Sequence, residues 1–304
     1  MTSSPDSDFE DFFLSPVSDD QYMKRMGTKS DKDNYLSLFP YFGGKTHLLD
    51  DIYRMYFPVR AKTKCFVDVF GGSGKVLLNL PYSAYIKKIY NDIDSSLYNV
   101  MHAMQNDAER EELINKLKWS FDSREEFERC KNEDSVYCFL YRAVLSYAST
   151  MDSFPARIEY RKSEISILEG NILKTYKTIR TWAIENLDYK KILERYDSPN
   201  TFFYLDPPYI TQGRKYKFHF TLDDFFEMYG ILKDLKGNWL MNESDKDFEE
   251  IRKIFGEPNT IINYTNHVIQ NSSSRYEGFW INYKITTPEW RGMVDVSVKK
   301  EMVK

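Results

Sequence analysis

The chain has 304 residues, 42% of them apolar, which allows a soluble globular protein with one large core or one core and a smaller appended domain. Its formal charge of −4 argues only weakly against a polyanionic partner, because six acidic and no basic residues fall in the first twenty positions. The remainder is close to neutral, so nucleic acid is not excluded. We interpret residues 1–34 as an acidic, disordered segment.

Cysteine, histidine and hydropathy patterns exclude several classes of protein. Cys65, Cys130 and Cys138 form no CxxC pair and indicate no disulfide framework, which favours a reducing cytosol. The histidines lie too far apart for metal-ligand spacing. No apolar run approaches the ~20 residues of a membrane span, and the amino terminus is acidic where a signal peptide would be basic. We therefore expect a cytoplasmic protein that needs no metal.

From about residue 35 the chain begins with strand patterns. The stretch "KCFVDVFGGSG" (64–74) predicts a buried strand followed by a glycine turn, and "IKKIYNDID" (86–94) predicts a second strand. Between them "KVLLNLP" predicts a short crossover helix, so the order indicates a βαβ unit with parallel strands. Residues 97–150 and 163–196 then show helical periodicity with many charges and no strand signal.

Strand patterns return at "NTFFYLDPPY" (200–209). There follow a helix, "LDDFFEMYGILKDL", a buried strand, "NWLMNES", and two strand-like runs, "NTIINYTNHVI" and "EGFWINYKI". The polar "QNSSSRY" joins the last two runs, which predicts a hairpin at the far edge of the sheet. The expected fold is α/β: a Rossmann-like sheet with an antiparallel edge hairpin and an inserted helical domain. We expect the sheet domain at 35–100 and 186–290, the insert at 101–185 and a tail at 291–304.

The glycine turn after the first strand lets a ligand approach bare backbone amides. It is not a P-loop, because Val69 stands five residues before Gly74 and Val76 occupies the Ser/Thr position. The similar stretch "FGGKT" fails because Phe39 stands where the first glycine belongs, and the dinucleotide fingerprint fails at Leu77. On its own, the turn is equally consistent with a structural role.

Acidic residues end the second strand, some twenty residues after the glycines. An acid here can accept hydrogen bonds from both ribose hydroxyls of an adenosine-containing ligand. The alternative is that Asp92 or Asp94 caps the following helix. Adenosine without a phosphate-binding loop suggests S-adenosylmethionine, whose charged sulfonium needs carboxylates and aromatic faces.

The stretch "FYLDPPY" places an acid, two prolines and a tyrosine at the end of a buried strand. The prolines cannot continue the strand ladder, so the strand stops at Asp206, at the sheet edge where ligands bind in α/β proteins. The Asp206 carboxylate and the Pro207 carbonyl can hold both N–H groups of an exocyclic amine and aim its lone pair at a methyl group. Pro208 keeps the turn rigid, and Tyr209 offers a stacking face for a base taken out of its duplex. The alternative is an ordinary turn with a capping aspartate.

Four motifs in this order resemble the Dam-like DNA adenine N6-methyltransferases: "PYFGGK" (40–45), "DVFGGSGKVLLN" (68–79), "NDID" (91–94) and "FYLDPPY" (203–209). The resemblance covers about residues 35–287. It implies a Rossmann-like S-adenosylmethionine-dependent methyltransferase sheet and makes the helical insert a target-recognition domain. It also implies S-adenosylmethionine as cofactor and double-stranded DNA as partner, and leaves open a cognate restriction endonuclease.

The resemblance also implies roles for individual residues. Asp92 matches the ribose-binding acid better than Asp94, because the family places that acid directly before a hydrophobic residue, and Asp188 in "ENLDY" resembles the acid that contacts the cofactor's adenine. For Tyr41 and Lys45 the alternatives are a core aromatic and a surface lysine. The expected catalytic residues are Asp206, Pro207, Pro208 and Tyr209. The expected cofactor-binding residues are Tyr41, Lys45, Asp68, Phe70, Gly71, Gly72, Ser73, Gly74, Asp92, Ile93, Asp188 and Asp206.

The sequence departs from the family in the recognition region. Enzymes that act on GATC carry an Asn-Gly-Leu-x-Arg type element, whereas this chain has "SYASTMDSFPARIEYRKSE". The target sequence is therefore open. Six cationic residues could contact phosphates or guanine edges, or form a solvated face: Arg157, Arg161, Lys162, Arg214, Lys215 and Lys217.

We predict a DNA adenine N6-methyltransferase that transfers the methyl group directly to a flipped adenine. The N4-cytosine class uses similar chemistry and is the nearest alternative, and structured RNA is a third possible substrate. A catalytically idle DNA-binding accessory protein is an alternative from another class. Its expected signature is a damaged cofactor turn or a replaced Asp206, and neither occurs in this sequence.

Overall fold

A computed structural model describes residues 35–81, 86–146, 150–154, 164–211, 217–268 and 271–285. The predictions for the segment 1–34 and the tail 291–304 fall outside these residues. Within the described ranges, the strands are β1 (Cys65–Asp68), β2 (Lys87–Asn91), β3 (Ala183–Glu185), β4 (Thr201–Leu205), β5 (Asn238–Ser244), β6 (Thr260–Val268) and β7 (Asn271–Ile281).

The helices fall into three groups along the chain. The first group precedes and follows β1: η2 (Thr46–Leu48), α3 (Leu49–Tyr56), η3 (Phe57–Lys62) and α4 (Lys75–Leu78). The second lies between β2 and β3: α5 (Ser95–Gln105), α6 (Asp107–Lys118), α7 (Arg124–Cys130), α8 (Val136–Leu145) and α9 (Glu164–Ile179). The third connects the later strands: α10 (Tyr189–Tyr196), α11 (Leu222–Leu232), η6 (Asp245–Asp247) and α12 (Phe248–Phe255).

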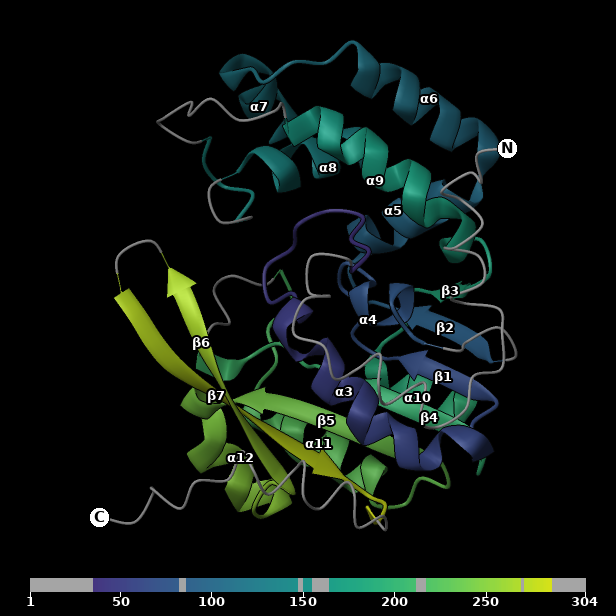
Figure 1. Cartoon of the computed structure of the whole chain (residues 1–304), viewed down its shortest axis with the longest axis vertical. Coiled ribbons are helices and arrows are strands. Elements are labelled where there is room, and N and C mark those ends of the chain that lie inside the picture. Colours follow the sequence, from purple (N-terminus) through teal and green to yellow (C-terminus); the bar gives the residue numbers. More distant parts are fainter. Residues whose placement is uncertain are drawn as a thin grey trace, which may run out of the picture.

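Within the described residues the strands form one seven-stranded sheet in the order β3-β2-β1-β4-β5-β7-β6. The first five of these are parallel, and β7 runs antiparallel to both β5 and β6. This order confirms the predicted fold class, a Rossmann-like sheet with an antiparallel edge hairpin. Figure 1 shows the β6–β7 hairpin projecting beyond the rest of the sheet. From β1 the chain continues to β2 and β3 on one side, and from β4 it continues to β5 on the other side. The strand order therefore reverses between β1 and β4.

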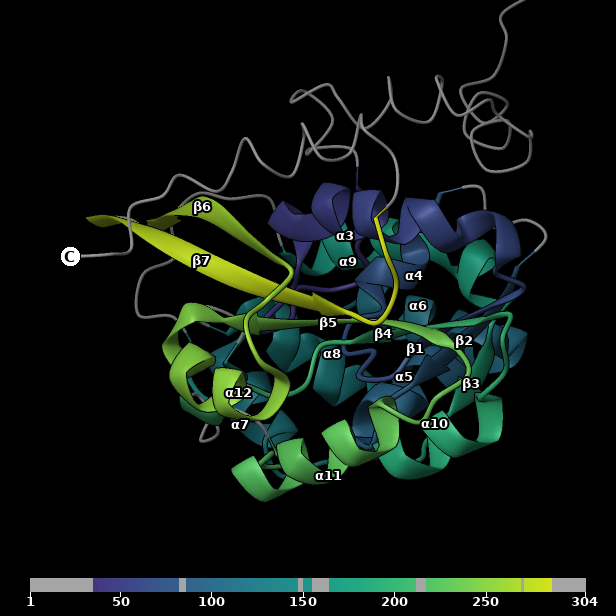
Figure 2. The same cartoon turned by 90° about the horizontal axis from the view of Figure 1, so that it is seen from below.

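Both faces of the sheet are buried at its centre, which explains why β4 is a nearly continuous apolar run. On β4, Phe202 and Tyr204 belong to the core on one face, while Phe203 and Leu205 belong to the core on the other. This alternation is the period of two that a pleated strand imposes. In Figure 2 helix α3 lies on one face of the sheet, and α10, α11 and α12 lie on the other.

The helices α5–α9 gather at one end of the molecule, beyond β3 and β2 (Figure 1). They share the larger core cluster with one face of the sheet, through side chains such as Val100, Leu140 and Ile172. The sheet resumes at β3, before the boundary at residue 186 that the sequence predicts. This strand has only three residues, all half-buried, so it carries no apolar run that would identify it.

Two further details differ from the sequence predictions. The stretch "QNSSSRY" does not simply connect the hairpin strands, because β7 already begins at Asn271 and pairs with β6 through polar residues. Cys130 and Cys138 form a disulfide, contrary to the expectation of reduced cysteines. The two cysteines are separated by eight residues, a spacing that does not by itself predict a disulfide. The sulfurs meet only because α7 packs against α8. Among the described residues, no helix is long and apolar enough to cross a membrane.

Candidate active site

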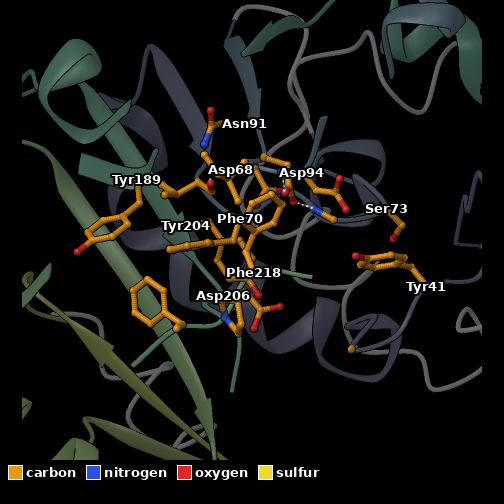
Figure 3. A pocket seen from close by; sticks show the side chains of 18 of the residues that line it. Tyr41, Asp68, Phe70, Ser73, Asn91, Asp94, Tyr189, Tyr204, Asp206 and Phe218 are labelled. Atoms are coloured by element: carbon orange, nitrogen blue, oxygen red, sulfur yellow. Dashed lines mark hydrogen bonds between the residues drawn. The ribbon is translucent and has the colours of Figure 1, made fainter. Parts of the chain in front are cut away.

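A pocket opens at the carboxyl ends of β1, β2 and β4, beside the point where the strand order reverses. Parallel strands present their last residues at one edge, and this switch point is where α/β sheets bind ligands. Figure 3 shows side chains from several strands and loops converging on it, with Tyr41 and Ser73 on one side, Tyr189 on the other and Asp68 and Asp206 between them. The lining includes eleven of the twelve residues predicted to bind the cofactor, all but Gly74: Tyr41, Lys45, Asp68, Phe70, Gly71, Gly72, Ser73, Asp92, Ile93, Asp188 and Asp206.

The glycine turn requires glycine at specific positions. A Cβ atom added to Gly71 would lie 2.3 Å from the ring of Tyr90, and Gly74 adopts φ = +69° with Trp182 close by. The Tyr90 hydroxyl donates a hydrogen bond to the Gly72 carbonyl at 2.7 Å. The turn is therefore packed directly onto the second strand, and a side chain at Gly71 would displace it.

Asp92 and Asp94 have different structural roles. Asp92 accepts hydrogen bonds from the backbone N–H of Gly72 and of Asp94, both at 2.9 Å, and so joins the glycine turn to β2. Asp94 caps α5 by accepting from the Ser96 N–H, and it pairs with Lys217 at 3.0 Å. Burial raises the pKa of Asp92 to about 6, although its two backbone hydrogen bonds oppose the rise.

Asp68, the last residue of β1, is a buried carboxylate that faces the pocket. It is 1% exposed, and its Oδ1 atom has no hydrogen-bond partner among the described residues. Burial raises its pKa well above the ordinary value, and the charges of Asp206 and Asp92 raise it further. A buried acceptor without a partner is costly, so a donor arriving in the pocket would be stabilised here.

Asp206 is held by two partners from other parts of the chain. The Lys45 Nζ atom lies 2.8 Å from Asp206 Oδ1, and the Asn242 amide on β5 donates to the same oxygen at 3.2 Å. Burial raises the pKa of Asp206, while Lys45 and Asn242 act in the opposite direction. Lys45, although it lines the pocket, is thus the ion-pair partner of Asp206 and not a surface lysine.

Tyr209 is fixed through its hydroxyl group. The hydroxyl accepts a hydrogen bond from Lys45 at 2.6 Å and donates one to the Glu277 carboxylate on β7 at 3.0 Å. Tyr209 is buried, and of the two prolines it is Pro208 that lines the pocket. The orientation of the ring is therefore set by charged groups on both sides of its hydroxyl.

Sequence reasoning did not identify Asn242 and Glu277. Asn242 bridges the site, because its Oδ1 accepts from the Tyr204 hydroxyl at 2.7 Å while its amide donates to Asp206. Glu277 is 2% exposed, and burial raises its pKa while Lys45 opposes the rise. For Lys45, burial would lower the pKa, but Asp206 and Glu277 outweigh it and the pKa lies above the ordinary value. The sequence signal that could have identified Asn242 is its position as a polar residue after the apolar residues of "NWLMNES".

Most of the predicted DNA contacts fall outside the described residues: Arg157, Arg161, Lys162, Arg214 and Lys215. Lys217 is described, and it lines the pocket beside Asp94. It also lines a second cavity of about 750 Å³ between this pocket and the helical insert, together with Phe42, Arg142 and Met151. Asp188 caps α10 through the Lys190 N–H and lines the first pocket, and its predicted contact with the cofactor's adenine stays a prediction.

The fold and pocket define an α/β protein of the methyltransferase class, and comparison with known proteins gives the family. The model of the D12 class N6 adenine-specific DNA methyltransferases matches residues 41–267, so the chain belongs to this family, which confirms the resemblance inferred from the motifs. DNA adenine methylases of Salmonella typhi and Salmonella typhimurium are 38% identical over 96 residues, which cover 30% of this chain. The chain thus matches 33% of the length of these relatives.

Among solved structures, a SAM-dependent O-methyltransferase from Thermotoga maritima is similar with a TM-score of 0.31 and 13% identity, over 75% of this chain and 62% of that one.

Proposed function

We propose that the protein transfers a methyl group from S-adenosylmethionine to the exocyclic N6 amine of an adenine in double-stranded DNA. The observation that carries this proposal is the position of Asp206. Asp206 directly follows β4, and its carboxylate lines the pocket and is oriented by Lys45 and Asn242. Membership of the adenine-specific family favours adenine over cytosine.

The residues of the pocket fit the cofactor. Asp68 offers an acceptor without a partner, Asp92 lies against the glycine turn, and Tyr41 and Phe70 supply aromatic faces. We assign the ribose hydroxyls to Asp92, the ammonium group to Asp68 and the adenine ring to the region of Asp188. S-Adenosylmethionine, when bound, supplies the electrophilic methyl group.

Asp206 and Pro207 would hold the target amine. The carboxylate accepts one N–H of the amine and the Pro207 carbonyl accepts the other, which turns the nitrogen lone pair out of the plane of the base. Lys45 favours the ionised form of Asp206, which is the form that accepts a hydrogen bond. On methylation the amine nitrogen would give up one N–H proton, which the Asp206 carboxylate is placed to accept and to pass on to water.

Pro208 and Tyr209 would position the extrahelical base. An adenine in the duplex is stacked and cannot reach Asp206, so the base must be flipped into the site. Tyr209 is proposed as the stacking residue, with its ring orientation held by Lys45 and Glu277. The helices between β2 and β3 are proposed as the recognition domain, because the second cavity is lined both by their residues, such as Arg142, and by Tyr41 and Lys217 of the pocket.

The experiment is nucleoside mass spectrometry on unmethylated, mixed-sequence duplex DNA incubated with S-adenosylmethionine and the protein. We expect N6-methyladenine from the wild type and from the control Asp234→Ala, an exposed residue beyond α11. Asp206→Ala should lower the rate at least about 100-fold, because an oriented acceptor is lost, while the cofactor still binds. Wild-type N4-methylcytosine instead of N6-methyladenine would overturn the base assignment, and near-normal turnover of Asp206→Ala would overturn its role.

A further inference from the structure

Lys75 connects the glycine turn to the loop that carries "PYFGGK". It is the first residue of α4, directly after Gly74, and its Nζ donates a hydrogen bond to the Thr46 hydroxyl at 2.8 Å. A Cβ atom placed on Gly44 would lie 3.9 Å from this nitrogen. The ammonium group therefore lies where two loops of the pocket meet, and Lys75 lines the pocket.

Three lysines line this pocket, and two of them have carboxylate partners. Lys45 pairs with Asp206 at 2.8 Å and Lys217 pairs with Asp94 at 3.0 Å. Among the described residues, no carboxylate lies within 4.0 Å of the Lys75 ammonium group, and its one hydrogen bond goes to a neutral hydroxyl. Burial accordingly lowers the pKa of Lys75.

An ammonium group has three N–H donors, so two remain for a ligand. The lining of the pocket is mainly acidic, and Lys75 is a cation within it that has no carboxylate partner among the described residues. Six aspartates line the pocket: Asp68, Asp92, Asp94, Asp188, Asp206 and Asp224. A carboxylate bound among these acids needs a cation to offset their repulsion, and Lys75 is the cation that no protein carboxylate neutralises.

We propose that Lys75 binds the carboxylate of the methionine moiety of S-adenosylmethionine. This inference rests on the proposed function, because it takes that cofactor as the occupant of the pocket. Lys75 and Asp68 would then hold the two charged groups of the amino acid, the carboxylate and the ammonium, near the glycine turn. Asp92 would hold the ribose on the other side of the turn. The cofactor thereby has one orientation, with its amino acid end toward the "PYFGGK" loop.

The alternative is that Lys75 only ties two loops together through Thr46. Calorimetry with two ligands distinguishes the roles: S-adenosylhomocysteine, and its decarboxylated form S-adenosylthiopropylamine, which keeps the ammonium group and lacks only the carboxylate. Lys75→Met should weaken binding of S-adenosylhomocysteine about 10- to 100-fold, the range for losing a charge-assisted hydrogen bond, and change binding of the decarboxylated ligand less than about threefold. Lys75→Arg keeps the positive charge and should retain most of the preference for S-adenosylhomocysteine over the decarboxylated ligand.

Thr46→Val is the matched control, because it removes the hydrogen bond between Thr46 and Lys75 and leaves the charge of Lys75 in place. We expect it to retain the preference for the ligand with the carboxylate. Equal weakening of both ligands by Lys75→Met, or an equal loss with Thr46→Val, would overturn the inference. If Lys75→Met does not fold, the wild type decides: similar affinity for both ligands excludes a carboxylate contact. A wild-type protein that binds neither ligand would instead contradict the proposed function.

Discussion

At the scale of single residues, Asp92 has a structural role, and the proposed function gives it a second role as the acceptor for the cofactor's ribose. Its oxygens already accept the N–H groups of Gly72 and Asp94, and each oxygen has further lone pairs for the two ribose hydroxyls. Protonation of Asp92 would leave its oxygens fewer lone pairs to accept hydrogen bonds from the backbone N–H groups and from the ribose hydroxyls. Because burial places the pKa of Asp92 at about 6, this change falls in an accessible range of pH.

Cofactor affinity should therefore depend on pH through Asp92. We expect S-adenosylhomocysteine to bind more weakly as the pH falls below about 6, with a slope that approaches tenfold per pH unit. Calorimetry between pH 5 and pH 8 measures this, with Asp92→Asn as the comparison. The variant should bind weakly at neutral pH and lose the Asp92 part of the pH dependence. Parallel curves for the two proteins would contradict the assignment.

Glu277 gives a second prediction for a residue outside the pocket lining. Glu277→Ala removes the hydrogen bond that the Tyr209 hydroxyl donates at 3.0 Å and one of the carboxylates near Lys45, so we expect turnover to fall about tenfold. Glu277→Gln keeps an acceptor oxygen and should lose less. Affinity for S-adenosylhomocysteine should stay within about threefold of the wild type in both variants. Steady-state kinetics and calorimetry separate these effects, and equal losses of turnover and affinity would mean a general disturbance of the fold.

The residues that sequence reasoning identified and those it missed differ in a physical way. Asp206 follows an apolar run and Asp92 follows the short strand pattern of "IKKIYN", so their positions at strand ends could be predicted from local pattern alone. Glu277 reaches the site only because β7 pairs antiparallel with β5, with Glu277 opposite Ser244. Register between strands that are distant in the chain depends on the packing of the whole sheet, and no local pattern specifies it.

At the scale of elements, the same distinction separates predictable strands from unpredictable ones. β1 and β4 are buried on both faces and are mostly apolar, so each is a run that the sequence reveals, whereas β2 and β5 are apolar only in part. β3 is short and half-buried, and its inclusion in the sheet follows from its pairing with β2. The helical insert was predictable as helical, but the contact between α7 and α8 that pairs Cys130 with Cys138 was not.

This disulfide should stabilise the helical insert. It closes a loop with a sequence separation of 8, for which restriction of the unfolded chain contributes about 2 to 3 kcal/mol. We expect a reductant to lower the melting temperature of the wild type by several degrees and to leave the double variant Cys130→Ser/Cys138→Ser unchanged. Cys65→Ser is the matched control, since Cys65 is a free cysteine, and it should respond to the reductant as the wild type does. A wild type that melts at the same temperature with and without reductant would contradict the prediction.

At the scale of the whole molecule, the sheet brings several carboxylates into the interior. Glu243 is fully buried at the end of β5, with its Oε2 atom lacking a partner among the described residues. Burial raises the pKa values of Glu243, Asp68, Asp206 and Glu277, and Lys45 is the cation among them. The fold thus maintains a site that is electrostatically unfavourable at neutral pH, as expected where acceptors are arranged for ligands.

These raised pKa values determine how stability should depend on pH. Each such carboxyl group binds its proton more tightly in the folded than in the unfolded protein. Its contribution to the free energy of unfolding is therefore complete below the unfolded pKa near 4 and is lost as pH rises through the folded pKa. For Asp92 that loss runs from the unfolded pKa near 4 to the folded pKa of about 6, and the groups with higher folded pKa values extend it to higher pH. We expect the melting temperature to fall from pH 5.5 to pH 8, by roughly 2–4 °C for each kcal/mol lost.

Glu243→Gln tests the cause of this dependence. The amide oxygen can still accept the Ser244 N–H, which donates to Glu243 at 2.9 Å, and the side chain no longer titrates. We expect the variant to lose less stability than the wild type between pH 5.5 and pH 8, as measured by circular dichroism melts in a single mixed buffer. The exposed Glu249→Gln should follow the wild-type curve. A wild-type melting temperature that rises over this range would show that the buried carboxylates are ionised at less cost than their burial implies, because the ion pair with Lys45 would then dominate the interior.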